Sequence, residues 1–303
     1  MTLLQTPLEA HFFLNRTFYI KRDDLLHPDF SGNKARKFYY FLSHDFSHIQ
    51  RIVSYGSNQS NAMYSLSVLA KMRGWEFLYF CDHVPHFLRQ NPIGNYRYAI
   101  ENGMRLMISQ NRYHDAHQLE DDVTLVIEEG GRQKEAEIGI KNLALELCED
   151  IDKQHLENPC VFLPSGTGTT ALYLQKYLPY PVYTCTTVGS REYLEEQWNM
   201  VESSCEHPII LDSSKKYHYG KLYQEAYALW ARLQHEMGVT FDLLYDPIGW
   251  IKLLENIEKI KGNVIYIHQG GLKGNLSMQA RYERKYGKMN ERITRKIDAN
   301  IKN

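Results

Sequence analysis

The chain has 303 residues, of which 43% are apolar and 23% are charged, and its formal net charge is −1. This composition is typical of a globular protein and excludes a largely disordered one. The balance of 35 Lys and Arg against 36 Asp and Glu gives no electrostatic reason to expect binding to nucleic acid or to an anionic membrane. The expected partner is therefore a small molecule or a second copy of the chain.

Targeting segments and metal sites are not recognisable in the sequence. Residues 1–10 lack the basic start and apolar run of a secretory signal, and no stretch approaches the roughly 20 apolar residues needed to cross a bilayer. The five cysteines are scattered without a Cys-x-x-Cys pair, which disfavours disulfides and structural zinc. His44 with His48, and His83 with His86, have helical spacing but no third ligand. We expect a cytoplasmic protein without a metal.

Short apolar runs alternate with longer amphipathic stretches, which predicts an α/β fold with a largely parallel sheet. The expected strands cover residues 51–55, 77–81, 105–108, 124–127, 160–163, 182–186, 209–211 and 263–268. The expected helices cover residues 62–73, 171–177 and 223–237, and residues 281–303 are expected to form a solvated helix or tail. Because no repeat or flexible linker separates these elements, we expect two lobes on a continuous core.

The first segment that could carry chemistry is SGNKARK, residues 31–37. A lysine in such a basic run is ordinarily a solvated charge. Alternatively, Gly32 and the residue after it form a tight turn that aims Lys34 inward at a helix start. A desolvated lysine near other cations can lose its proton and attack an aldehyde to give a Schiff base. Arg36 and Lys37 would supply part of that positive field.

Two turns that follow expected strands could bind a ligand. The Ser/Asn turn (GSNQSN, residues 56–61) has the composition of a plain capping loop, but it also suits a carboxylate and a phenolic oxygen at the carboxyl end of a strand. The Gly/Thr turn (SGTGTT, residues 165–170) lies between a strand and a helix and predicts a phosphate cradle. Neither nucleotide-binding motif fits the Gly/Thr turn, so a phosphorylated cofactor is expected.

Together these segments resemble the 1-aminocyclopropane-1-carboxylate deaminase/D-cysteine desulfhydrase family of fold-type-II pyridoxal-phosphate enzymes. The matching pieces, in the family's order, are IKRDD, SGNKARK, GSNQSN, EEGG (128–131), PSGTGTT, YDPI (245–248) and IHQGG (267–271). The resemblance implies a two-lobed, three-layer α/β fold like that of the tryptophan synthase β-like enzymes. It also implies a small lobe at residues 41–128, a large cofactor-binding lobe formed by residues 1–40 and 129–303, and a homodimer.

The resemblance implies roles for individual residues as well. Lys34 would hold pyridoxal 5′-phosphate, and Asn61 would donate a hydrogen bond to its phenolic oxygen. The phosphate would be bound by Ser165, Gly166, Thr167, Gly168, Thr169 and Thr170. The substrate carboxylate would be received by Gln59, Ser60 and Asn61. Tyr219 falls where the family keeps an active-site tyrosine, so the expected catalytic residues are Lys34, Ser60 and Tyr219.

The chain departs from the family near the pyridine nitrogen. Aligned without a gap, the family's Asp-Pro-Val-Tyr-Thr/Glu-Gly-Lys stretch corresponds to residues 246–252, so that Gly249 replaces the tyrosine and Trp250 the Thr or Glu. An indole can only donate a hydrogen bond. Gln269 is then the expected partner of the nitrogen, and a neutral partner would leave the ring a weaker electron sink.

The expected activity is that of a pyridoxal-phosphate-dependent lyase. It would catalyse α,β-elimination of a thiol or hydroxyl from a small D-cysteine- or D-serine-like amino acid, to give pyruvate, ammonia and, from the D-cysteine-like substrate, sulfide. Two alternatives stay open. One is a 1-aminocyclopropane-1-carboxylate deaminase or an amino acid dehydratase on the same fold, and the other is a diverged paralogue that binds cofactor or amino acid without turning it over.

Overall fold

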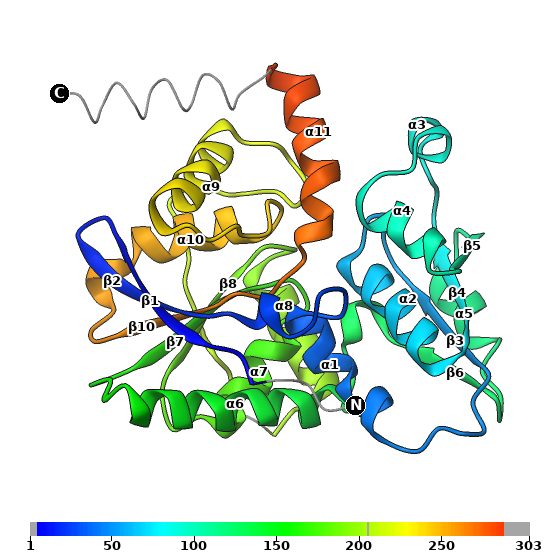
Figure 1. Cartoon of the computed structure of the whole chain (residues 1–303), viewed down its shortest axis with the longest axis horizontal. Helices are drawn as coiled ribbons and strands as arrows, with labels where there is room; N and C mark the ends of the chain where they lie inside the picture. Colours follow the sequence, from blue (N-terminus) through cyan, green and yellow to red (C-terminus); the bar gives the residue numbers. More distant parts are fainter. Residues whose placement is uncertain (1–4, 205, 288–303) are drawn as a thin grey trace.

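The structure is a computed structural model and describes residues 5–204 and 206–287. It contains two sheets, which occupy opposite ends of the molecule in Figure 1. The larger sheet has the strand order β1-β2-β10-β7-β8-β9, and the smaller has the order β5-β4-β3-β6. Neighbouring strands pair in parallel, except for the antiparallel pair of β1 and β2. The predicted α/β class with largely parallel pairing is confirmed.

The elements have the following bounds. The larger sheet contains β1 (Leu8–Phe13), β2 (Arg16–Lys21), β7 (Cys160–Ser165), β8 (Val182–Thr186), β9 (Ile209–Ile210) and β10 (Val264–Ile267). The smaller sheet contains β3 (Arg51–Tyr55), β4 (Glu76–Cys81), β5 (Arg105–Ile108) and β6 (Thr124–Ile127). The α-helices are α1 (Gly32–Ser43), α2 (Asn61–Arg73), α3 (His86–Gln90), α4 (Gly94–Glu101), α5 (Arg112–His117), α6 (Ala136–Lys153), α7 (Thr169–Tyr177), α8 (Arg191–Val201), α9 (Gln224–Met237), α10 (Asp246–Glu255) and α11 (Asn275–Tyr286). The 3₁₀ turns are η1 (Asp23–Leu25), η2 (Glu129–Gly131), η3 (Ile257–Lys259) and η4 (Leu272–Gly274).

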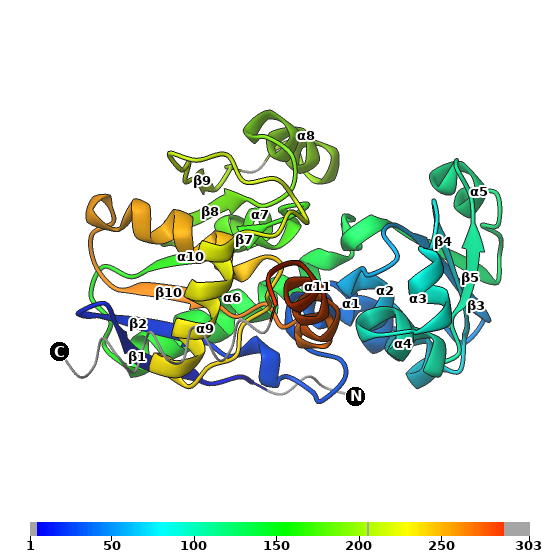
Figure 2. The ribbon, with the colours of Figure 1, turned by 90° about the horizontal axis from the view of Figure 1, so that it is seen from above.

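Helices cover both faces of the larger sheet, as β7 illustrates. All six residues of β7 are buried, which is typical of a strand in the middle of a parallel sheet. Because side chains alternate along a strand, Val161 and Leu163 pack with α6 and α7, whereas Cys160 and Phe162 pack with α9 and α10. Figure 1 shows this layering, with α9 and α10 above the larger sheet and α6 below it, and Figure 2 shows from above that the smaller sheet and its helices lie at the other end.

All eight predicted strands are present, but the hairpin of β1 and β2 was not predicted. Its connecting residues, Leu14 and Asn15, have φ angles of 50° and 60°; Asn15 is a residue type that favours such a turn, but Leu14 is not, and no Gly accompanies them. Of the predicted C-terminal tail, residues 281–286 belong to α11, and residues 288–303 lie outside the described residues. Among the helices that the structure describes, none is both long and apolar enough to cross a bilayer.

Helix α1 lies between the two lobes and carries Lys34 toward the space between them. Its Phe38 packs in the core of the smaller sheet. On its other side α1 approaches α6 closely, because a Cβ atom at Gly139 would lie 1.9 Å from the carbonyl oxygen of Arg36. The Arg36 guanidinium is buried and paired with Asp23 at 2.8 Å and with Glu146 at 2.6 Å. Arg36 therefore anchors α1 and does not add to the positive field around Lys34, which corrects the prediction.

Candidate active site

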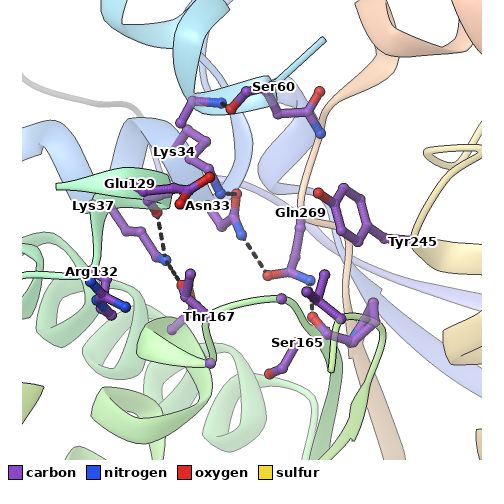
Figure 3. A pocket seen from close by; sticks show the side chains of 18 of the residues that line it. Asn33, Lys34, Lys37, Ser60, Glu129, Arg132, Ser165, Thr167, Tyr245 and Gln269 are labelled. Carbon is purple, nitrogen blue, oxygen red and sulfur yellow. Dashed lines mark hydrogen bonds between the residues drawn. The ribbon is translucent and has the colours of Figure 1, made fainter. Parts of the chain in front are cut away.

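A cavity of about 350 Å³ brings the three predicted segments together. The start of α1 contributes residues 33, 34 and 37, the Ser/Asn turn contributes residues 57, 60 and 61, and the Gly/Thr turn contributes five of its six residues. Figure 3 shows side chains from these segments around one space, with Tyr245 and Gln269 on the opposite wall from Lys37. The carboxyl ends of two strands and the first turns of three helices thus converge on one site, as expected for an α/β ligand site.

Lys34 is held at the cavity by a close approach of two backbone segments. Gly32 has a φ angle of +65°, and a Cβ atom there would lie 1.9 Å from the carbonyl oxygen of Gln269, so this turn requires glycine. Asn33 donates a hydrogen bond from its Nδ2 to Gln269 Oε1 at 2.8 Å and accepts one from Lys34 Nζ at 3.3 Å. Burial lowers the pKa of Lys34 to about 8, although the carboxylate of Asp242 opposes this shift. About a tenth of Lys34 is therefore an uncharged, nucleophilic amine at pH 7.

Lys37 is a second lysine at this cavity, and its position beside the Gly/Thr turn was not predicted from the sequence. Its side chain is 2% exposed, and Nζ donates to the carbonyl oxygen of Gly130 at 3.0 Å and to Thr167 Oγ1 at 3.2 Å. Within the described residues no carboxylate pairs with it. Burial lowers its pKa well below the usual value, and the charges of Lys34 and Arg132 act in the same direction. A buried lysine with only neutral partners is driven toward its uncharged form, and an anion bound beside it would restore its charge.

The Gly/Thr turn has the shape and the free hydroxyl that an anion site needs. Its cavity-lining residues are Ser165, Gly166, Thr167, Gly168 and Thr170. Gly168 has a φ angle of +73°, and a Cβ atom there would lie 2.2 Å from Trp198 Nε1. Thr170 Oγ1 is buried and has no hydrogen-bond partner among residues 5–204 and 206–287. Thr169 does not line the cavity, and its hydroxyl lies 3.3 Å from that of Thr167, so we place it behind the other five residues.

The Ser/Asn turn contributes Ser60 and Asn61 to the cavity but not Gln59. Ser60 caps α2, and its Oγ accepts hydrogen bonds from the backbone N–H groups of residues 62 and 63. Asn61 Nδ2 donates to Asp242 Oδ2 at 3.3 Å, and its Oδ1 accepts from Asn95 at 2.6 Å. Gln59 instead donates to the carbonyl oxygen of Ile93 at 3.2 Å, beside α4. The predicted contact of Gln59 with substrate is corrected accordingly.

Trp250 does not lie at the cavity, so the gapless pairing with the family motif is wrong. Its indole is fully buried and stacks on Tyr266, with ring centroids 4.5 Å apart. Gly249 packs against Pro164 in the same helix–sheet interface. An alignment shifted by four residues pairs Asp242 with the aspartate of the family motif. It pairs Tyr245 with the motif's tyrosine and Asp246 with its Thr or Glu. The sequence signal was present as Asp-x-x-Tyr-Asp, residues 242–246.

The two residues recovered by this shift are Tyr245 and Asp246, and both line the cavity. The hydroxyl of Tyr245 lies 3.2 Å from that of Tyr219, which confirms that Tyr219 lies beside the site. Burial raises the pKa of both tyrosines. The site therefore holds a pair of protonated phenols on the wall that faces the Ser/Asn turn.

Asp246 is a buried acid at the cavity wall. Its carboxylate accepts from Tyr266 Oη at 2.7 Å and from the backbone N–H of Asp242 at 2.9 Å, and no cation pairs with it within the described residues. Burial and the nearby Asp242 raise its pKa well above the usual value, and burial raises that of Asp242 to about 6. Gln269 also lines the cavity, but its amide already donates to the carbonyl oxygen of Pro164 and accepts from Asn33. Asp246 is thus the acid that a basic ring nitrogen would stabilise.

Comparisons with known proteins agree with this geometry. No family model matches the chain. It is 24% identical to D-cysteine desulfhydrase of Serratia proteamaculans (strain 568) and 26% identical to that of Yersinia enterocolitica, in each case over 88% of this chain and 91% of the relative. Its structure is similar to that of an ACC deaminase homologue, with a TM-score of 0.76, 20% identity and coverage of 93% of both chains. It is also similar to the processed form of threonine deaminase isoform 2 from Solanum lycopersicum, with a TM-score of 0.62, 13% identity and coverage of 89% of this chain and 84% of that one. These likenesses confirm the predicted fold.

Proposed function

Since the chain resembles the 1-aminocyclopropane-1-carboxylate deaminase/D-cysteine desulfhydrase family of fold-type-II pyridoxal-phosphate enzymes in sequence and fold, we propose that it is a lyase of this kind. It eliminates the β-substituent of a small D-cysteine-like amino acid and yields pyruvate, ammonia and sulfide. The observation that carries the proposal is the presence of Lys34, with its lowered pKa, in the same cavity as the Gly/Thr turn. Pyridoxal phosphate, when bound, supplies an electron sink for the charge that develops at the substrate Cα.

The residues present fit this cofactor, because each end of the cavity has a buried ionisable group that lacks a partner of opposite charge within the described residues. Lys37, the N–H groups of the Gly/Thr turn and the free hydroxyl of Thr170 would hold the phosphate. The carboxyl of Asp246 would hold the ring nitrogen, and Asn61 would donate to the phenolic oxygen. A molecule with a dianionic phosphate and a basic ring nitrogen complements both ends of the cavity.

The side chains of the cavity would bind the substrate carboxylate and remove the proton from the substrate Cα. The first turn of α2, with Ser60 and Asn61, receives the substrate carboxylate, because helix N-termini attract anions. Lys34 Nζ, once free of the cofactor, takes the proton from the substrate Cα, for which its pKa of about 8 is well matched. Tyr219 and Tyr245 place two hydroxyls beside the reacting atoms.

Keto-acid and sulfide release from purified protein tests this function. We expect D-cysteine or a close analogue to give pyruvate and sulfide in equal amounts from a panel of D- and L-amino acids. A 2-oxobutanoate product from 1-aminocyclopropane-1-carboxylate alone would identify a deaminase instead. A spectral change on binding without any product, across the whole panel, would identify a binding paralogue.

Lys37→Met is expected to weaken cofactor binding by about 10- to 100-fold, because a charged hydrogen bond to the phosphate is lost, worth roughly 1.5–3 kcal/mol. Fluorescence titration of the cofactor-free protein with pyridoxal phosphate measures this change. Lys153→Met, which removes a lysine exposed at the end of α6, is the matched control. Equal affinities of the two variants would show that Lys37 does not bind the phosphate.

We also propose, from the same resemblance, that the chain forms a homodimer and works in the cytoplasm. The small lobe would comprise residues 41–128, a range that contains the whole smaller sheet, β3 to β6. Light scattering on the purified protein tests the dimer. A monomer mass at micromolar concentration would contradict it.

A further inference from the structure

Glu129, in η2 just after β6, is an acid of the cavity that the proposed function leaves without a role. Within the described part of the chain its carboxylate accepts no hydrogen bond. Its nearest cation is Arg112, with Nη2 3.6 Å from Glu129 Oε2. Arg112 is itself held by both carboxylate oxygens of Asp82, at 3.1 and 3.0 Å, so its charge is already compensated.

The neighbouring Glu128, by contrast, has a carboxylate that several side chains of the protein bind. It accepts a hydrogen bond from Tyr55 Oη at 2.5 Å and pairs with His117 at 2.9 Å and with Arg132 at 3.5 Å. Glu128 does not line the cavity, whereas Glu129 does. The contrast between two adjacent glutamates indicates that the fold holds Glu129 only through its ion pair with Arg112, and that its carboxylate is accessible to a ligand in the cavity.

Glu129 lies beside the turn that is proposed to receive the substrate carboxylate. A Cβ atom at Gly56, the first residue of the Ser/Asn turn, would lie 2.9 Å from Glu129 Oε1. Figure 3 shows Glu129 and Lys34 both projecting into the cavity, from η2 and α1. An amino acid anchored at Ser60 and Asn61 would therefore lie in the same cavity as both groups.

Burial raises the pKa of Glu129, against the opposing charges of Arg112 and Arg132. The charges of Asp82 and Glu128 also raise the pKa of Glu129. The charge of Glu129 in turn raises the pKa values of the tyrosines at positions 79, 193, 219 and 245. A raised pKa makes the Glu129 carboxyl better suited to donate a proton than a fully solvated glutamate is.

We propose that Glu129 protonates the leaving group of the elimination, and that it thereby extends the activity from thiol to hydroxyl leaving groups, so that β-hydroxy amino acids are substrates. This inference rests on the proposed function. The Cα proton passes to Lys34 Nζ, and the electron pair of the Cα–H bond becomes the Cα=Cβ bond. The Cβ–O bond breaks with its pair on oxygen, and the Glu129 proton completes a water molecule. Lys34 then releases its proton to solvent and Glu129 takes one up, which restores both groups.

The need for this proton depends on the leaving group. A thiol has a pKa of about 8.5, so thiolate can leave near neutral pH with little help. Hydroxide is the conjugate base of water, whose pKa is about 15.7, so it requires protonation as it leaves. Chloride requires none. The contribution of a general acid is roughly 10²- to 10⁴-fold in rate where the proton is needed.

The test compares serine with β-chloroalanine, each as both enantiomers, in the holoenzyme and in its Glu129→Gln variant. We expect pyruvate formation from serine to fall by roughly 10²- to 10⁴-fold in the variant, while β-chloroalanine changes by less than about 3-fold. Cysteine should fall between the two. Glu128→Gln, in the same loop, is the matched control, and it should leave the ratio of serine to β-chloroalanine rates unchanged.

The outcomes separate the two proposals. An equal loss for serine and β-chloroalanine in Glu129→Gln, or turnover of β-chloroalanine but not serine by the unmodified enzyme, would overturn the role of Glu129 alone. No turnover of cysteine or β-chloroalanine would overturn the lyase function and this inference with it. Should Glu129→Gln fail to fold, Glu129→Ala, which also lacks the carboxyl, carries the same comparison.

Discussion

Lys34→Ala is expected to abolish both the covalent attachment of pyridoxal phosphate and the elimination, with a loss of turnover of roughly 10³-fold or more. The reason is that Lys34 is the amine that lies in the cavity with a pKa lowered to about 8. The visible absorbance of the cofactor–lysine adduct and the rate of pyruvate release measure the two effects. Lys34→Arg retains the charge without a nucleophilic amine and should fail equally.

The rate of cofactor attachment should rise with pH, because only the uncharged form of Lys34 reacts. Lys34 attacks only as the neutral amine, so attachment to the cofactor-free protein should accelerate by about tenfold per pH unit below pH 8 and level off above it. An unshifted lysine would keep accelerating to about pH 10.4. A rate that still rises between pH 9 and 10 would contradict the lowered pKa.

Asp246→Asn is expected to lower kcat/KM by roughly 10²- to 10³-fold while leaving cofactor affinity within about tenfold of the unmodified protein. The asparagine can still accept from Tyr266, but it carries no negative charge for a protonated ring nitrogen. The phosphate contacts of Lys37 and the Gly/Thr turn are untouched, which is why binding should survive. Steady-state kinetics and cofactor titration measure the two quantities separately.

Trp250→Phe is the matched test of the corrected alignment. Trp250 packs on Phe18 and Tyr266 in the core and has no hydrogen-bond partner for its Nε1 among the described residues. The change should therefore cost about 1–3 kcal/mol of unfolding free energy through the space it leaves, with little effect on kcat/KM. A large kinetic effect of Trp250→Phe, together with a small one of Asp246→Asn, would restore the gapless alignment.

The sequence allowed most of the fold to be predicted because its strands are strongly marked. The run CVFLPS of β7 is continuously apolar before its turn, and so is RIVSY of β3 apart from its first residue and one serine, as expected for strands covered on both faces. The hairpin of β1 and β2 escaped because its turn is Leu14-Asn15 and its strands carry mixed side chains. Tertiary packing, not local sequence, specifies that edge of the sheet.

The site residues were predicted correctly where several motifs agreed. The prediction was wrong where the alignment depended on a single dipeptide. Lys34 and the two turns were placed correctly beside one cavity. The Asp246-Pro247 pair imitated the family's Asp-Pro and fixed the alignment four residues too late. Lys37 could have been found, because positions three apart share a helix face and Lys34 was already assigned inward. Arg36 lies on another face of α1, and its two carboxylate partners are distant in sequence.

The most direct test of the account is to identify the lysine that carries the cofactor. Borohydride reduction of the protein with pyridoxal phosphate, followed by peptide mass spectrometry, should find a single pyridoxyl group on Lys34. Its neighbour Lys37, three residues away on the same helix, should remain unmodified. A pyridoxyl group on any other lysine, or on none, would contradict the claim that Lys34 and the Gly/Thr turn together form the cofactor site.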